Sequence, residues 1–345
     1  MFDRPVLVIA PDLAIADQLE DTLTVSANEE ENFLLKRNIV ARRRFNLVLP
    51  NGKKIEETKQ VGSKLHLQMF EIIIANAQKF LQGNWENNLP NDIFKLVIVD
   101  EAHHHASQTW RRIIQKFKNH AMVVFFTATP FRGDEKPVLP TGEGETVYRL
   151  PLQDARQQRI IRDINWRDPL VGGETDLERF NLILETVKAI QEDKDSRHPL
   201  PEGIPHMAIA ITRNIDCAQQ VAGLWNSDWG NPGSAIAYHS NIRPKREKKA
   251  MREKIKTNQV KLVVVVESLL EGFDHPPISI AAIMTKIVSP AKFAQFIGRA
   301  QRIQRGPEGL LEAEGIRADV VTHTFFQQQE NIQAFEDERL IPVDS

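Results

Sequence analysis

A short apolar run that ends in two acids constrains the fold of this chain more than any other feature. Leu96 to Val99 are four consecutive apolar residues, and Asp100 and Glu101 follow them directly. A continuous apolar run of this length is typical of a strand buried on both faces of a parallel sheet. The two acids then lie at the carboxyl edge of that sheet, where open α/β folds bind ligands. One carboxylate can hold Mg²⁺, and the other can orient or deprotonate a water molecule.

Similar apolar runs recur along the chain and predict an α/β architecture with mostly parallel sheets. Strands are predicted over residues 6–10, 71–78, 122–126, 207–211, 235–240, 263–266 and 278–284. Helical spacing is found over residues 13–23, 110–114, 155–161, 215–225 and 243–256. A loop rich in Gly and Pro from 133 to 146 predicts a boundary, so we expect domains of 1–147 and 148–345. A second region, 192–205, is rich in charged residues and proline. It interrupts the second domain without ending it.

Composition narrows the class of protein. The chain has 345 residues, of which 41% are hydrophobic and 26% charged, enough for two domains with cores of their own. The net charge of −2 requires any nucleic-acid-binding surface to be local. The one cysteine, Cys217, excludes internal disulfides and suits a reducing cytoplasm. No apolar run approaches the roughly 20 residues of a membrane span, and we expect neither a signal peptide nor a membrane partner.

Polar strings follow several of the predicted strands. Thr127-Ala128-Thr129-Pro130 follows one strand, Glu267 to Asp274 follows another, and Gln295 to Arg302 lies near the end. Arg299 and Arg302 are three positions apart on a predicted helix and therefore share a face. Guanidinium groups suit phosphate oxygens and can stabilise charge that develops during phosphate transfer. Taken alone, the Gly-Arg sequence would favour two surface arginines of an amphipathic helix.

Together these strings resemble the motifs of DEAH/DEAD-box members of helicase superfamily two. Asp-Glu-Ala-His at 100–103 resembles motif II, a Walker B sequence, and 127–130 resembles motif III. Residues 267–274 resemble motif V, and Gln-x-x-Gly-Arg-x-x-Arg at 295–302 resembles motif VI. Motifs Ia and Ic are weaker matches, at 6–19 and 71–78. The resemblance extends over residues 1 to about 325 and implies two RecA-like domains, with ATP and Mg²⁺ between them and nucleic acid across both.

The resemblance also implies roles for individual residues. Asp100 is expected to hold Mg²⁺, Glu101 to activate the attacking water, and Arg299 and Arg302 to contact the phosphates. The other residues expected at the nucleotide are His103, Gly272, Asp274 and Gln295. The residues expected to bind nucleic acid, or to couple it to the nucleotide, are Pro11, Asn76, Thr127, Thr129, Thr212, Arg213, Glu267 and Ser268.

One part of the family pattern does not occur in the sequence. No Gly-x-x-x-x-Gly-Lys-[Ser/Thr] string, the P-loop that cradles nucleotide phosphates, is found. In relatives the P-loop strand lies beside the motif III strand. We therefore expect a first domain that is incomplete at its N-terminus, with an unpaired apolar edge at 123–126. Truncation, a mis-called start and degeneration of a longer helicase all fit this pattern.

Two functions follow. The first is an ATP-hydrolysing helicase or translocase, impaired by the missing P-loop, that acts on single-stranded or duplex DNA rather than RNA. The second is a nucleotide-independent nucleic-acid-binding module or an inert remnant. The oligomeric state does not follow from the sequence.

Two basic segments could add a phosphate-binding surface. Residues 36–44 are predicted as a solvated face, with a phosphate-contacting patch as the alternative. Residues 243–256 are predicted as a solvated helix, because glutamates dilute its charge. Three adjacent histidines at 103–105 do not suit zinc, since neighbouring side chains point in different directions.

Overall fold

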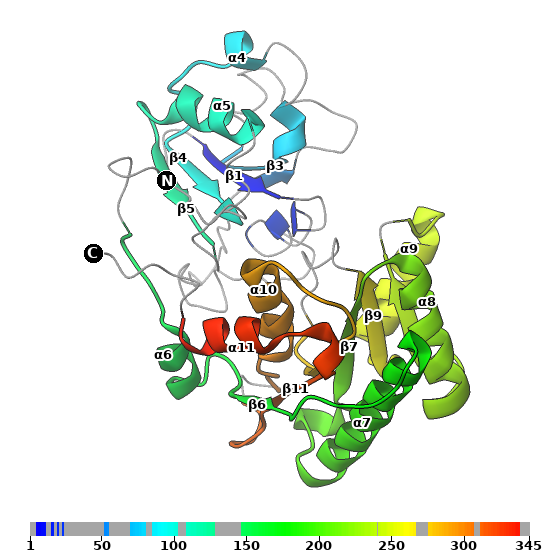
Figure 1. The fold of residues 1–345 in the computed structure, drawn as a ribbon. Coiled ribbons are helices and arrows are strands. Elements are labelled where there is room, and N and C mark those ends of the chain that lie inside the picture. The colour runs from blue at the N-terminus through cyan, green and yellow to red at the C-terminus, as the bar shows by residue number, and fades with distance from the viewer. Residues whose placement is uncertain are drawn as a thin grey trace. The chain divides into compact units, whose positions relative to one another are not determined.

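The chain divides between Gly144 and Glu145 into two compact units, each built on a parallel β-sheet (Figure 1). The computed structural model describes residues 5–11, 15–16, 19–20, 23, 52–54, 70–80, 85–102, 108–127, 146–239, 241–266, 275–306 and 311–338. Within these residues, no helix combines the length and apolar character needed to cross a bilayer.

The first unit has a five-stranded parallel sheet in the order β2-β3-β1-β4-β5. The strands are β1 (Val6–Ala10), β2 (Gly52–Lys54), β3 (Ile72–Asn76), β4 (Leu96–Val99) and β5 (Met122–Phe125). The helices are η2 (Ala77–Phe80), α4 (Trp85–Asn88) and α5 (Gln108–Phe117). Trp110 and Phe117 of α5 join Leu7, Ile9 and Val97 in one core on one face of the sheet. The predicted parallel architecture is confirmed for this unit.

The two strands at one end of this sheet are less buried than β1. All five residues of β1 are buried, whereas in β4 Val97 and Val99 are buried but Leu96 and Ile98 only partly so. The prediction of burial on both faces is therefore wrong for β4. Within the described residues β5 pairs with β4 alone, and Met122 is 67% exposed. The apolar edge predicted at these residues is present.

The second unit has a six-stranded parallel sheet in the order β6-β11-β10-β7-β9-β8. The strands are β6 (Ile164–Trp166), β7 (Met207–Thr212), β8 (Ala235–Tyr238), β9 (Leu262–Val266), β10 (Ile278–Ile283) and β11 (Ala318–Thr322). The α-helices are α6 (Leu152–Gln157), α7 (Asp176–Arg197), α8 (Ile215–Leu224), α9 (Lys245–Lys256), α10 (Pro290–Ala300) and α11 (Gln329–Glu336). Shorter turns of helix are η4 (Pro201–Gly203), η5 (Trp225–Trp229) and η8 (Thr324–Phe326).

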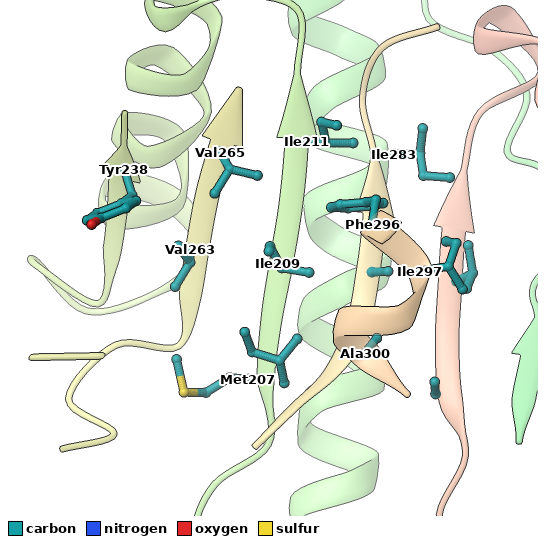
Figure 2. Close-up of a cluster of buried hydrophobic side chains, with 14 of the residues drawn as sticks. Met207, Ile209, Ile211, Tyr238, Val263, Val265, Ile283, Phe296, Ile297 and Ala300 are labelled. Atoms are coloured by element: carbon teal, nitrogen blue, oxygen red, sulfur yellow. The ribbon is translucent and has the colours of Figure 1, made fainter. Parts of the chain in front are cut away.

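Helices cover both faces of this second sheet. Successive side chains of β7 point to opposite faces of the sheet, as expected for a strand with a two-residue period. The strand therefore contributes to a separate core on each face. Met207, Ile209 and Ile211 share one core with Phe296 and Ile297 of α10 (Figure 2). Ala208 and Ala210, on the other face, pack in the core formed with α7 and α8. The predicted RecA-like α/β class with mostly parallel sheets is confirmed.

Helix α7 was not predicted. Its last residues occupy part of the region 192–205 that was expected to interrupt the second domain. It runs for 22 residues to Arg197. Thr175 caps its start by accepting from the backbone N–H of Glu178, whose carboxylate accepts from the backbone N–H of Thr175. This reciprocal capping box favours a helix start and is visible in the sequence as Thr-x-x-Glu.

The two ends of the second unit are bonded to each other. Glu338, two residues after α11, accepts hydrogen bonds from the backbone N–H of Leu152 at 2.8 Å and from Nη2 of Arg149 at 3.1 Å. Arg156 of α6 makes a paired contact with Glu336 of α11, with nitrogen–oxygen distances of 2.9 and 3.1 Å. The last described helix therefore holds the segment that begins the unit.

Candidate functional site

The carboxyl edge of the first sheet gathers the candidate residues of the first unit. Val99 of β4 is level with Ile9 of β1 and with Phe125 of β5. The residues that follow are Pro11 after β1, Asp100 and Glu101 after β4, and Thr127 after β5. Neighbouring strands lie about 4.8 Å apart, so these residues occupy one rim of the sheet. This is the edge at which open α/β sheets bind ligands.

Asp100 is a fixed and partly buried carboxylate. Its backbone N–H donates to the carbonyl oxygen of Ile9 at 3.0 Å, which ties it to β1. Burial raises the pKa of Asp100, and the hydrogen bond from the backbone N–H of Glu101 opposes that rise. A carboxylate that is poorly solvated gains from a nearby cation. Oxygen donors of this kind suit Mg²⁺, which commonly uses one or two carboxylates together with water and phosphate oxygens. Asp100 therefore fits the expected metal ligand.

Glu101 has a left-handed backbone with a φ of 48°. Such a conformation costs a residue with a side chain about 1–2 kcal/mol. Backbones of this kind persist only where their surroundings fix them, and they cluster at functional sites. Here the fixing bonds are on both sides: the N–H of Phe126 donates to Val99, and the N–H of Ala102 donates to Phe126. The turn that carries Glu101 is thus held between β4 and β5.

Asn76 links two strands at the same rim. Its side-chain nitrogen donates to the carbonyl oxygen of Pro11 at 3.0 Å, and its side chain is buried. Thr127 is half-buried after β5. His103 and Thr129 lie outside the described residues. Within the part of the chain that the structure describes, no group of three His, Cys, Asp or Glu residues could hold a metal ion.

In the second unit, α10 carries two of the candidates. Arg299 is buried near the end of the helix, and Gln295 is half-buried one turn earlier. Arg302 does not share a helix face with Arg299, and this prediction is wrong. The helix ends at Ala300, and Arg302 pairs with Ile161 in an isolated antiparallel bridge.

Gln301 explains why the helix stops there. Its carbonyl accepts from the backbone N–H of Arg162 at 2.6 Å, and its side chain donates to the carbonyl of Arg162 at 3.0 Å. These two bonds pair the backbone after α10 with the segment around Arg162, so the chain leaves the helical path.

Thr212 is the last residue of β7 and Arg213 follows it, but their side chains lie in different environments. Thr212 is completely buried, and its hydroxyl lies 3.2 Å from the carbonyl oxygen of Asn214 and 3.3 Å from that of Val265. Its side chain therefore fixes the turn into α8 and does not reach the surface. Arg213 is exposed and pairs with Asp176 at 3.2 Å. The expected residues Glu267, Ser268, Gly272 and Asp274 lie outside the described residues.

Asp176 is a residue of this edge that sequence reasoning missed. It binds Arg213 and also Arg179, both at 3.2 Å, from the first turn of α7. The guanidinium of Arg179 in turn lies 3.9 Å from the ring centre of Phe325, which is 54% exposed. The capping box at Thr175 was the available signal, since it places Asp176 at a helix start.

Comparisons with known proteins agree with this fold. The profile of the family "Type III restriction enzyme, res subunit" matches residues 2–132. The structure of helicase Lhr from Mycobacterium smegmatis bound to ssDNA and AMP-PNP covers 97% of this chain, with a TM-score of 0.62 and 15% identity. The chain shares the fold of this helicase. The resemblance predicted from the motifs is thereby confirmed.

Two further relatives show how much of a longer protein this core represents. The putative mitochondrial ATP-dependent helicase irc3 of Schizosaccharomyces pombe is 26% identical in an alignment of 238 residues, and the match covers 63% of this chain and 37% of that protein. Dbp5 of S. cerevisiae, solved with RNA and ADP BeF3, covers 97% of this chain at a TM-score of 0.61 and 15% identity. This chain spans 76% of Dbp5 and 42% of Lhr. The chain therefore spans less than half of the length of irc3 and of Lhr.

Proposed function

We propose that this chain is the core of an ATP-dependent helicase or translocase that acts on DNA. The observation that supports it most is the single rim shared by Asp100, Glu101 and Thr127, in a unit that matches the family "Type III restriction enzyme, res subunit". In this proposal the residues up to 147 form the nucleotide-binding domain and those from 148 form the second helicase domain. A cytoplasmic location belongs to the same proposal and is supported by the single cysteine.

Each candidate residue has one task in the proposal. Asp100 holds Mg²⁺, and Mg²⁺-bound ATP supplies the phosphate whose transfer to water releases energy. Glu101 orients that water and accepts its proton, which suits a carboxylate held at a fixed backbone turn. Arg299 neutralises charge on the phosphates. Asn76 and Pro11 hold the rim on which a nucleic-acid strand rests.

The remaining candidates extend the same proposal. At the nucleotide these are Arg302, His103, Gln295, Gly272 and Asp274; at the strand they are Thr127, Thr129, Arg213, Glu267 and Ser268. The preference for DNA over RNA is supported by the restriction-enzyme family match and by relatives described with DNA.

The decisive experiment compares ATP hydrolysis by the chain and by two variants, with and without single-stranded DNA and RNA. Glu101→Gln and Arg299→Ala are expected to abolish stimulated turnover while strand binding persists. Glu185→Gln, an exposed position on α7, is the matched control and should leave turnover unchanged. Equal turnover in the wild type and in both site variants would contradict the proposal.

A second candidate function is nucleotide-independent binding of nucleic acid. The absence of a P-loop string from the 345 residues favours it. It requires that ATP and Mg²⁺ leave the affinity for a single strand unchanged. A tenfold change in affinity on their addition would exclude it.

A further inference from the structure

Helix α9 carries more positive charge than its glutamates offset. Its 12 residues include seven Lys or Arg and two Glu. Four basic positions, 245, 249, 252 and 256, are spaced by four, three and four residues. At 3.6 residues per turn this spacing aligns them in one stripe along the helix. The helix is solvated as expected, and neither of its glutamates occupies a position of this stripe.

The helix is oriented by its apolar residues. Ile255 is buried in the core that also contains Tyr238, and Met251 packs against the same core. Lys249 and Lys256 are exposed. The basic stripe therefore lies along the flank of α9, between the face that packs on β8 and the side that carries Glu253.

Within the described residues, two cations of this stripe, Lys249 and Lys256, lack the neutralising partners found on α7. Each of the four basic residues of α7 forms an ion pair, namely Arg179, Lys188, Lys194 and Arg197. Among the residues that the structure describes, neither Lys249 nor Lys256 has an acidic partner within ion-pair distance. A charged surface that is not compensated internally is suited to a polyanion.

Arg252 is held in place by an aromatic residue. Its Nε donates to the hydroxyl of the buried Tyr238 at 2.6 Å. The ammonium group of Lys248 lies 5.4 Å from the centre of the same ring. Arginine has five N–H donors, so this bond leaves the outer fork of Arg252 available for phosphate oxygens. A cation fixed in this way loses less conformational freedom on binding.

The stripe begins at the sheet edge that carries Arg213. Helix α9 connects β8 to the parallel strand β9, so its first turn lies at the carboxyl edge of the second sheet (Figure 1). Only β9 separates β8 from β7, whose end bears Arg213, a lateral distance of about 10 Å. From position 245 to 256 the stripe extends roughly 16 Å away from that edge.

We propose that the basic stripe of α9 binds the phosphate backbone of a nucleic acid and extends its path beyond the rim of the second sheet. The nature of the polyanion rests on the proposed function, whereas the stripe itself does not contain any residue assigned to ATP hydrolysis. Each phosphate contact on a single strand adds about 0.7 to the salt dependence of binding. Removing two contacts should therefore lower the slope by about 1.4 and weaken binding roughly 10- to 30-fold at 0.1 M salt.

The test measures the binding of labelled oligo(dT) and of duplex DNA across a salt series by fluorescence anisotropy. Lys249→Gln with Lys256→Gln removes two charges from the stripe. Arg246→Gln with Lys254→Gln removes two charges from other sides of the same helix and is the matched control. Glutamine keeps helix propensity close to that of Lys and Arg, and circular dichroism verifies that both double variants fold.

We expect the stripe variant to lose affinity and salt slope, and the control to change affinity less than twofold. Equal losses in both variants, or no loss in the stripe variant, would overturn the proposal. Equally tight binding of poly-glutamate would also overturn it, in favour of an acidic polypeptide as the ligand. If the wild type binds strands through the stripe but hydrolyses no ATP, only the proposed motor function fails.

Discussion

The side-chain amide of Asn76 donates a hydrogen bond to the backbone carbonyl of Pro11 at 3.0 Å, across 65 positions of sequence. The bond joins the ends of β3 and β1 at the rim that also bears Asp100. Asn76→Ala should lower the free energy of unfolding by about 1–3 kcal/mol, because it leaves the carbonyl of Pro11 without this donor. Urea denaturation measures the effect, with Asn88→Ala, an exposed asparagine, as the control. Equal stability of both variants would show that the bond does not support the rim.

Arg162 and Glu312 form an ion pair from which solvent is excluded. Nε and Nη2 of Arg162 each lie 2.6 Å from an oxygen of Glu312, and the two side chains are 0% and 2% exposed. Arg162→Met leaves the buried carboxylate of Glu312 bonded to the backbone N–H of Gln304 but without its cation, and should destabilise the second unit by about 3–5 kcal/mol.

The double change Arg162→Met with Glu312→Leu removes both charges and should recover much of this loss. A double-mutant cycle by thermal denaturation measures the coupling between the two residues. Additive losses would contradict a directly coupled pair.

Two buried histidines should make the second unit sensitive to acid. Burial lowers the pKa of His206 and of His275 to about 4, from an ordinary value of 6.5. Between these values the unfolded chain takes up protons that the folded chain does not. The stability that the neutral rings contribute is therefore present above pH 6.5 and is lost as the pH falls towards 4, by up to about 3 kcal/mol for each ring.

Denaturation curves between pH 4 and 7 measure this loss. His206→Gln and His275→Gln should each reduce the dependence of unfolding free energy on pH. His120→Gln, on the exposed turn after α5, is the control for the loss of one histidine. An unchanged dependence in all three variants would refute the assignment.

The apolar edge at β5 should govern self-association of the chain. Exposed sheet edges pair with other chains, and a lysine placed on the edge opposes this. Met122→Lys should slow aggregation several-fold with little loss of stability, since Met122 is 67% exposed. Light scattering at 37 °C follows the reaction. Val147→Lys changes an apolar residue that is 81% exposed outside any strand, and an equal benefit from it would argue against the edge.

Strands with uniform apolar runs were predictable, whereas a strand interrupted by a charged residue was not. Val263 to Val266 lie in β9, as the sequence indicates. Strand β11 escaped prediction because Asp319 interrupts it, and only the folded unit brings Lys194 to within 2.9 Å of that carboxylate. The side chain of Asp319 is thereby tolerated inside a strand that is buried along its length.

The candidate site, like the fold, was predictable only in part. The position of Asp100 at a sheet edge follows from the apolar run before it. The left-handed backbone of Glu101 does not follow from the local sequence, because it depends on hydrogen bonds between β4 and the end of β5. Likewise, the position of Arg302 depends on pairing with Ile161, more than 100 residues earlier, and no local periodicity records that contact.

The bonds from Glu338 to Leu152 and Arg149 have a mechanical consequence. They join the segment that enters the second unit to the segment that follows α11, so that the polypeptide between these segments forms a closed loop. Tension applied through those two segments acts first on this clasp and reaches the strands only after it opens. A protein that moves against a resisting load would in this way keep its sheet out of the line of force.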